Sequence, residues 1–203
     1  MPFGQLAEVL SQKLFSEVGV GLTEDSKLFL AQKAFRNKNI DNYENLSLSW
    51  DQFNDDTFPG PLPDNKPFTF FEWFYAIMKT LKDHLGKLWR ENKIVGFISR
   101  QNAKNLLSYC TPGTFLLRFS DSIPGAITVS AVSSSGTVVS LEPFNSNDLN
   151  TRCLANRLRD LQMLNCLYPN MPKEEAFGEH YTTSELKSPN GYIKIELKTC
   201  VPG

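Results

Sequence analysis

The chain has 203 residues, of which 41% are hydrophobic and 12% aromatic, a composition typical of a packed globular protein with one large domain or two small ones. Its formal net charge of -1 argues against a dedicated nucleic-acid surface, which would carry a basic patch or stripe. The sequence shows no apolar run long enough to span a bilayer and no signal peptide in MPFGQLAEVL, so we expect no membrane insertion and a cytosolic or nuclear location.

The four cysteines predict packed, free thiols rather than a functional site. They form no CxxC pair and have no companion histidines at metal-ligand spacing. We therefore expect no metal and no cofactor. The residues concerned are Cys110, Cys153, Cys166 and Cys200.

Residues 1–92 have the pattern of helices separated by polar connectors. A first helix is predicted over Gln5–Val18, with a buried stripe of Leu6, Val9, Leu10, Leu14 and Val18. Thr23 is expected to cap a second helix that buries Leu28, Ala31 and Phe35, and the Ser49 to Gln52 pattern predicts a short third one. Prolines then predict a loop over Phe58–Asp64.

Thr69 and Glu72 match the capping box that starts a helix. An apolar stripe at helical spacing follows it, which makes this the clearest helix of the sequence and favours core packing over a cofactor site. The stripe consists of Trp73, Phe74, Ile77, Leu81, Leu85 and Leu88.

From Ile94 onward the pattern becomes mixed and predicts an α+β unit over residues 93–203. The expected order is a strand, a helix capped by Ser99, a turn, a central strand, a hairpin closed by Ser133–Gly136, two helices and a last strand. The corresponding ranges are Ile94–Ile98, Arg100–Ser108, Thr111–Gly113, Thr114–Phe119, Ala126–Val132 with Thr137–Leu141, a helix marked by Leu154, Leu158, Leu161 and Leu164, then Lys173–Tyr181 and Tyr192–Leu197.

Arg118 interrupts the apolar strand Thr114–Phe119 with a charge. In an extended strand it points to the same face as Leu116 and Ser120, so a guanidinium is presented from within an apolar segment. Burying it unpaired costs on the order of several kcal/mol, so it needs a partner. That partner is either an internal carboxylate, which is the common structural arrangement, or an anion from outside such as phosphate, whose oxygens suit the guanidinium fork.

The residues around Arg118 favour the external anion. Ser120, Asp121 and Ser122 follow at the strand end, where hydroxyls and turn amides can surround oxygen atoms. Arg100 opens the preceding helix as a second positive group, and Asp121 is interpreted as a loop organiser rather than a ligand.

These residues resemble a known family. Gly113–Ser122, preceded by Gly96–Arg100, resembles the Src-homology-2 (SH2) domain of the STAT proteins, the signal transducers and activators of transcription. Three earlier stretches look like the helical linker domain that precedes the SH2 domain in that family, and three later ones are similar to its closing segments. They are Gly21–Thr23 with Phe29–Lys33, Ser49–Asn54 and Phe70–Phe74, and then Arg157–Leu161, Leu167–Pro169 and Gly191–Lys194.

The resemblance implies a helical linker domain over 1–92 and, over 93–203, an SH2 domain with a central antiparallel sheet flanked by helices. Arg118 would clamp the phosphate of phosphotyrosine, Ser120 and Ser122 would donate hydroxyls, and Asp121 would line the loop through its backbone. Arg100 would stand where the family usually has a lysine. The resemblance therefore implies a non-catalytic binding module for phosphotyrosine peptides.

The implied partners are phosphotyrosine-containing peptides of receptors or of a second STAT-like chain, which serve receptor docking and dimerisation of the parent protein. The family's tail tyrosine, coiled coil and DNA-binding domain have no counterpart in the sequence, which is therefore interpreted as a linker plus SH2 fragment that reaches DNA only through absent domains. Nuclear entry of a cytoplasmic parent protein is implied by the resemblance alone.

Two alternatives stay open on the sequence. A hydrolase using Ser120 or Ser122 has no general base among the recognisable patterns, since His84 and His180 are better explained as surface or core residues. An interaction scaffold with a vestigial pocket would bind through the helical half and would not distinguish phosphorylated from unphosphorylated peptide.

Overall fold

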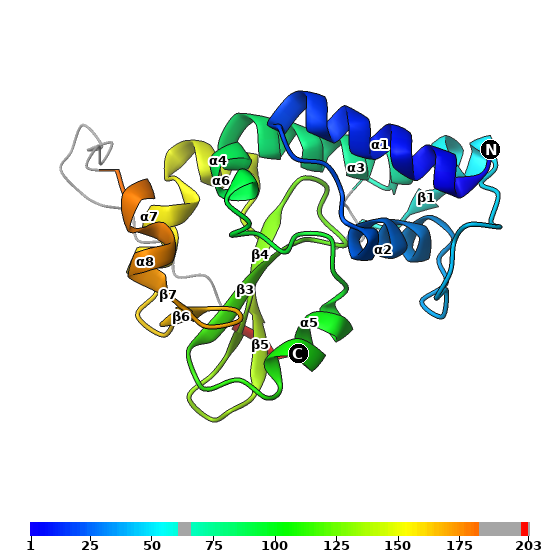
Figure 1. The fold of residues 1–203 in the computed structure, drawn as a ribbon. Helices are drawn as coiled ribbons and strands as arrows, with labels where there is room; N and C mark the ends of the chain where they lie inside the picture. Colours follow the sequence, from blue (N-terminus) through cyan, green and yellow to red (C-terminus); the bar gives the residue numbers. More distant parts are fainter. Residues whose placement is uncertain (61–65, 183–199, 203) are drawn as a thin grey trace. The chain divides into compact units, whose positions relative to one another are not determined.

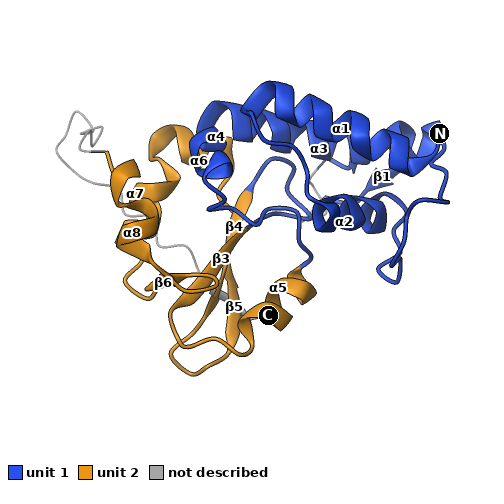
Figure 2. Cartoon of the chain, viewed as in Figure 1, with its two compact units in different colours: residues 1–99, 118–126 blue, residues 100–117, 127–203 orange. Residues whose placement is uncertain are grey.

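The computed structural model describes residues 1–60, 66–182 and 200–202, which form two compact units. The first unit consists of residues 1–99 together with 118–126, and the second of residues 100–117 together with 127–203 (Figure 2). The predicted strand Tyr192–Leu197 lies outside the described residues. Helices and a mixed sheet confirm the α+β fold class.

The first unit is mainly helical (Figure 1). Helix α1 contacts α2 and α4, while α3 leads directly into a π-helical turn at Leu81–Leu85. A two-stranded antiparallel pair, β1 with β2, precedes α3. The bounds are α1 Phe3–Val18, α2 Glu24–Ala34, a π-helical turn Asp51–Asp55, β1 Thr57–Phe58, β2 Phe68–Thr69, α3 Phe70–Thr80 and α4 Gly86–Arg90.

The predicted caps of this unit are confirmed. The Thr23 hydroxyl accepts a hydrogen bond from the Ser26 amide at the start of α2. Thr69 and Glu72 form the reciprocal capping box of α3, with bonds of 3.1 and 2.9 Å. Every member of the stripe predicted from Trp73 to Leu88 is buried, so the helix starts and the packed face were correctly inferred.

Two details of the predicted helical core were wrong. Val9 is 58% exposed, and Ala7 is buried in its place. Ala7 precedes Leu10 by three residues and Leu14 by seven, which puts it on the buried face of α1. In α2 the buried apolar residues centre on Phe29 to Ala31, so Leu28 and Phe35 are only half-buried.

The six-stranded sheet has the order β7-β6-β3-β4-β5-β8. Its β4–β5, β5–β8 and β6–β7 pairs are antiparallel, and β3 pairs with β6 in parallel, so the sheet is mixed. The bounds are β3 Thr114–Phe119, β4 Ile127–Val132, β5 Val138–Leu141, β6 Cys166–Leu167, β7 Met171–Pro172 and β8 Cys200–Pro202, with helices α5 Arg100–Leu107, α6 Ser146–Thr151, α7 Leu154–Asp160 and α8 Lys173–Phe177 (Figure 1).

The central strand and the hairpin were correctly predicted. Every residue of β3 and β4 is buried, which agrees with a strand covered on both faces. The Ser133 amide donates to the Thr137 carbonyl at 2.8 Å and closes the turn between β4 and β5.

The segment Ile94–Ile98 was predicted as a strand and is not one. It makes only an isolated parallel bridge between Gly96 and Arg118. Gly96 has a φ of 74°, and hydrogen bonds from Phe97 to Val95 and from Ile98 to Gly96 turn the backbone tightly. Local turning buries Ile94 and Phe97 but leaves Val95 exposed, so the β-branched composition of the run misled the prediction.

The predicted helix through Leu164 ends earlier, at Asp160. The ammonium of Lys173 donates to the carbonyl oxygens of Leu158, at 3.2 Å, and Leu161, at 3.1 Å. A cation at the end of a helix satisfies carbonyls that would otherwise lack donors, and it stabilises the negative end of the helix dipole. Leu161 and Leu164 therefore lie in the turn that follows α7.

Candidate functional site

Arg118 lies near the end of β3, within a strand whose apolar residues are all buried. Its own exposure is 5%, so the guanidinium is withdrawn from solvent as expected from the strand pattern. Its neighbour Phe119 packs against Phe97, with ring centroids 5.0 Å apart, and against Trp89 at 6.0 Å. The aromatic contacts on one side of the strand end thus fix the backbone that carries Arg118.

The guanidinium of Arg118 contacts the loop that follows it. Its Nη1 donates to the Phe119 carbonyl at 3.2 Å and lies 3.3 Å from Oδ2 of Asp121. The Asp121 side chain is 43% exposed, so this acid partner belongs to the surface loop rather than to the interior. A contact of 3.3 Å through one nitrogen is weaker than the bidentate geometry that arginine forms with carboxylate or phosphate.

This arrangement bears on the choice between an internal carboxylate and an incoming anion. An interior acid would hold Arg118 permanently, because separating a buried pair costs about 3–5 kcal/mol. Asp121 can instead turn toward water when a stronger oxyanion arrives, since an exposed carboxylate loses little solvation. The pair is compatible with exchange for phosphate.

The loop Ser120–Ile123 is organised by the Ser120 hydroxyl. Its oxygen accepts a hydrogen bond from the Ile123 amide at 3.1 Å and a longer one from the Ser122 amide at 3.4 Å. A serine hydroxyl that accepts still has one hydrogen to donate. Ser120 is buried, so its hydroxyl faces the inside of the loop that carries Ser122.

Side chains of the helical segments hold carbonyl groups of the same loop and of Gly125, which follows it. Trp73 Nε1 donates to the Ser120 carbonyl at 2.8 Å, and Lys33 Nζ donates to the Asp121 carbonyl at 3.1 Å. Thr80 Oγ1 donates to the Gly125 carbonyl at 2.7 Å. Sequence reasoning missed Lys33 and Trp73 as site residues, because an apolar stripe and a helical lysine carry no local sign of such a contact.

Lys33 has an altered titration. Burial lowers its pKa to about 8, an effect that the Asp121 carboxylate opposes and Arg36 reinforces. Its ammonium lies 4.4 Å from the centroid of the Trp73 ring and 4.6 Å from that of Phe58. The ring faces and the Asp121 carbonyl together replace part of the water lost on burial.

Arg100 begins α5 and is exposed. It belongs to the second compact unit, whereas Arg118, Ser120, Asp121 and Ser122 belong to the first. The structure therefore brings four of the five predicted residues together, and the part of Arg100 in phosphate binding stays a prediction.

Within the described residues, no helix is both long and apolar enough to cross a membrane, and no cluster of three or more metal-ligating side chains occurs. Three of the cysteines, Cys110, Cys153 and Cys166, are free thiols.

Comparison with known proteins gives two family matches, one in the N-terminal half of the chain and one in the C-terminal half. The family "Signal transducer and activator of transcription, linker domain" matches residues 1–74, which include Lys33 and Trp73. The SH2 domain family matches residues 94–168, which include Arg118 and the Ser120–Ile123 loop. The SH2 match supports a phosphotyrosine-binding function in signalling, since SH2 domains recognise phosphorylated motifs through arginine.

Comparison with individual proteins points to the same family. A "Signal transducer and transcription activator" of Anopheles gambiae is 40% identical over 208 residues, which cover 98% of this chain and 28% of that protein. Among solved structures, "Inactive choanoflagellate E3 ubiquitin ligase Cbl TKB" matches 88% of this chain and 48% of its own with 13% identity and a TM-score of 0.38, a likeness too low to support a conclusion. With the linker and SH2 families matched in this order and a relative that is similar along nearly all of this chain, the chain has the linker-plus-SH2 arrangement of the STAT family.

Proposed function

We propose that this chain captures phosphotyrosine-containing peptides, with Arg118 as the phosphate clamp. Ser120 and Ser122 donate hydroxyls, the Asp121 backbone lines the loop, and Arg100 adds positive charge. The observation that carries the proposal is a guanidinium buried on a strand, beside a hydroxyl-bearing loop and in contact with an exposed carboxylate of that loop. An incoming dianion offers this guanidinium a stronger, bidentate partner.

The proposed module has a helical linker over residues 1–92 and an SH2 domain over residues 93–203. Its peptides come from receptors or from a second STAT-like chain, so it serves receptor docking and phosphotyrosine-dependent dimerisation of the parent protein. The proposed location is the cytoplasm, with nuclear entry of the parent protein, and DNA is contacted only through other domains. We propose no enzymatic activity, because the chemistry required is recognition alone.

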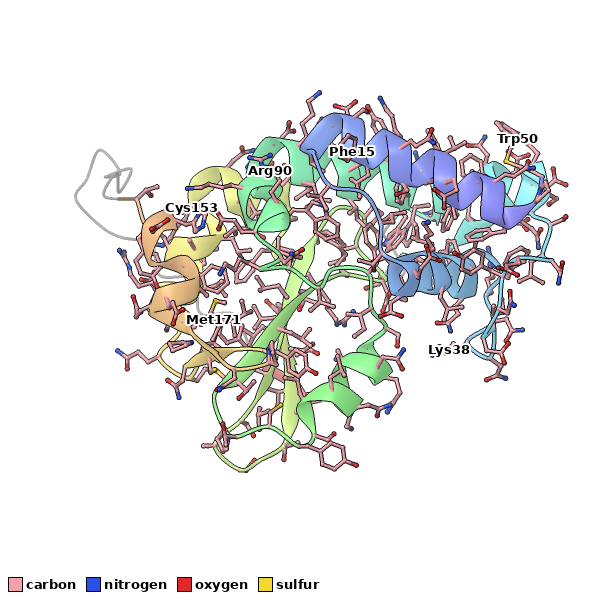
Figure 3. All side chains as sticks on the ribbon, in the orientation of Figure 1. Phe15, Lys38, Trp50, Arg90, Cys153 and Met171 are labelled. Atoms are coloured by element: carbon pink, nitrogen blue, oxygen red, sulfur yellow. The ribbon has the colours of Figure 1, made fainter. Side chains whose placement is uncertain are left out.

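Calorimetric titration tests this function with one peptide in two forms, tyrosine-phosphorylated and unphosphorylated. The phosphorylated form should bind and the unphosphorylated form should not. Arg118→Ala should weaken phosphopeptide binding about 100-fold or more, because it removes a charge-assisted contact to a desolvated anion. Arg90→Ala, which removes an exposed arginine of α4 (Figure 3), serves as the matched control and should bind as the parent does.

The scaffold alternative predicts a different result. Binding through the helical half would be equal for both peptide forms and unaffected by Arg118→Ala. Either observation would remove the phosphate clamp from the explanation. Exposed aromatic residues such as Phe15 and Trp50, labelled in Figure 3, would then become the first candidates for the binding surface.

A further inference from the structure

Two successive carbonyl groups of the phosphate-proximal loop are held by side chains far away in the sequence. The Ser120 carbonyl accepts a buried hydrogen bond from the indole of Trp73, 47 residues earlier. The Asp121 carbonyl accepts one from the ammonium of Lys33, 88 residues earlier. Trp73 lies on α3 and Lys33 on α2, so two separate helices hold adjacent peptide groups.

Holding a carbonyl also orients the amide that shares its peptide plane. In a trans peptide the C=O and the following N–H point in opposite directions. With the Ser120 carbonyl directed at Trp73, the Asp121 N–H points away from Trp73. With the Asp121 carbonyl directed at Lys33, the Ser122 N–H points away from Lys33 and donates a long hydrogen bond of 3.4 Å to Ser120 Oγ.

Backbone N–H groups of a turn such as these contribute positive potential that suits an anion. They immediately follow Arg118, whose Nη1 contacts the Asp121 side chain in the same loop. The proposed phosphate site depends on how these amides are oriented. That orientation is set by Trp73 and Lys33, which do not belong to the loop.

The surroundings of Lys33 favour a loop-directed role over a structural ion pair. Its ammonium is surrounded by the rings of Trp73, Phe58 and Phe68, whose centroids lie 4.4, 4.6 and 5.9 Å away. The ammonium donates its hydrogen bond to a backbone carbonyl rather than to a carboxylate. Lys27 on the same helix shows the contrasting arrangement, since it pairs with Glu8 and with Glu24.

We propose that Lys33 and Trp73 are positioning residues for phosphotyrosine binding, which fix the peptide planes Ser120–Asp121 and Asp121–Ser122 and thereby the shape of the loop that receives the phosphate. The proposal rests on the proposed function of the same site. Lys33 adds a positive charge behind the loop, and Trp73 adds a neutral donor. The helical linker thereby determines the affinity of the SH2 loop without touching the ligand.

Substitution at Lys33 tests the proposal in the full chain. Lys33→Met keeps an unbranched apolar stem among the rings but removes the donor and the charge, so it should weaken binding of a phosphotyrosyl peptide about tenfold. Lys33→Arg restores a cationic donor and should recover most of the affinity. Lys38→Met is the matched control: it makes the same substitution at an exposed lysine after α2 (Figure 3) and should leave affinity unchanged.

Trp73→Phe provides a second variant, because it keeps an aromatic ring in the core but removes the N–H donor. It should weaken phosphopeptide binding by about threefold to tenfold. Thermal unfolding of every variant is recorded alongside, so that a loss of affinity is compared with any loss of folding.

Proton uptake provides a readout that a merely structural lysine would not change. If the charged form of Lys33 is the one that supports binding, phosphopeptide binding raises its pKa from about 8, and the complex takes up a fraction of a proton near pH 8. The charged groups facing Lys33 are the Asp121 carboxylate and Arg36, and Arg118 in turn contacts Asp121. Phosphotyrosine itself is already dianionic near that pH, since its second pKa is about 6.

The uptake is measured by titration calorimetry at pH 8 in buffers of different ionisation enthalpy. The parent chain and Lys38→Met should take up protons, and Lys33→Met should not. Affinity of the parent chain should also fall between pH 7 and 9, while that of Lys33→Met stays level.

The outcomes separate the two proposals. If the phosphopeptide binds in an Arg118-dependent manner but Lys33→Met matches Lys38→Met in affinity and proton uptake, the positioning role is overturned and the proposed function stands. If the parent chain binds phosphorylated and unphosphorylated peptide equally, both proposals are overturned. Absence of proton uptake by the parent chain contradicts the role of Lys33 even where a variant fails to fold.

Discussion

Buried cationic side chains in this chain have different kinds of partner. Among the described residues, the charged side chains with the least exposure are Lys27, Arg118 and Lys173. Lys27 pairs with two carboxylates, and Lys173 donates to carbonyls at the end of α7. Arg118 instead lies beside a loop of hydroxyls and contacts an exposed acid, so burial and charge acquire a functional meaning only from the surrounding residues.

Gly96 is a residue at which one added carbon atom should lower stability. Its φ is 74°, and a Cβ there would lie 2.7 Å from Cε2 of Phe119 and 2.9 Å from Cζ3 of Trp89. Gly96→Ala should lower the free energy of unfolding by about 3 kcal/mol, from backbone strain and overpacking together.

Denaturant unfolding measures this loss. Gly136→Ala is the matched control, because its φ is 80° and no atom lies within 4 Å of the position that a Cβ would take. It should show only the backbone cost, about 1 kcal/mol. Equal losses at the two glycines would contradict the packing argument.

Glu24 is a second residue whose titration is altered by its neighbours. Hydrogen bonds from Lys27 and Tyr43 lower the pKa of Glu24 from its ordinary value of 4.5. A carboxyl whose pKa is lower in the folded state stabilises the fold above its unfolded pKa, and this contribution is lost as the pH falls through the folded pKa. The Tm of the parent chain should therefore fall more steeply below pH 4.5 than the Tm of Glu24→Gln. Parallel pH profiles of the two Tm values would contradict the assignment.

At the scale of elements, helix starts were inferred from the sequence more accurately than helix ends and strands. The capping residues Thr23 and Thr69 act through hydrogen bonds to amides three residues away, so the signal is local. The helix α6 was missed although Asn145 and Asp148 form the same reciprocal box, because no apolar stripe follows them. The end of α7 depends on Lys173, which approaches from another element and leaves no local sign.

The capping box of α3 offers a direct test at this scale. Thr69→Ala removes the hydroxyl that accepts from the Glu72 amide, and it should lower the free energy of unfolding by about 1 kcal/mol. Thr69→Ser keeps the hydroxyl and should retain most of that stability. Chemical denaturation of the two variants checks the difference, and an equal loss in both would assign it to the methyl group instead.

For the whole molecule, the proposed binding of phosphopeptide to the folded chain links stability to ligand concentration. A ligand that binds only the folded state adds about 2.7 kcal/mol at a concentration 100 times its Kd. The phosphorylated peptide at that concentration should raise the Tm of the parent chain by several degrees, and the unphosphorylated peptide should not. Arg118→Ala should lose the increase, as followed by thermal unfolding at fixed pH and salt.

The sequence by itself determined the α+β class, the main helices, the buried strand β3 and the presence of an arginine within it, because these follow from periodicity and capping over a few residues. It also carried the family resemblance around Arg118 that the comparisons confirmed. Ile94–Ile98 was misjudged, since a left-handed glycine and local turns outweighed its strand-like composition.

Only the tertiary structure decided that Asp121, an exposed acid three residues on, pairs with Arg118, and that Trp73 and Lys33 hold the two carbonyls beside it. Contacts across 47 and 88 residues leave no periodic trace in the chain, because each partner has an adequate local explanation as core aromatic or helical lysine. The geometry of a binding loop depends on such long-range partners, whereas the residues that bear its chemistry can be recognised one short segment at a time.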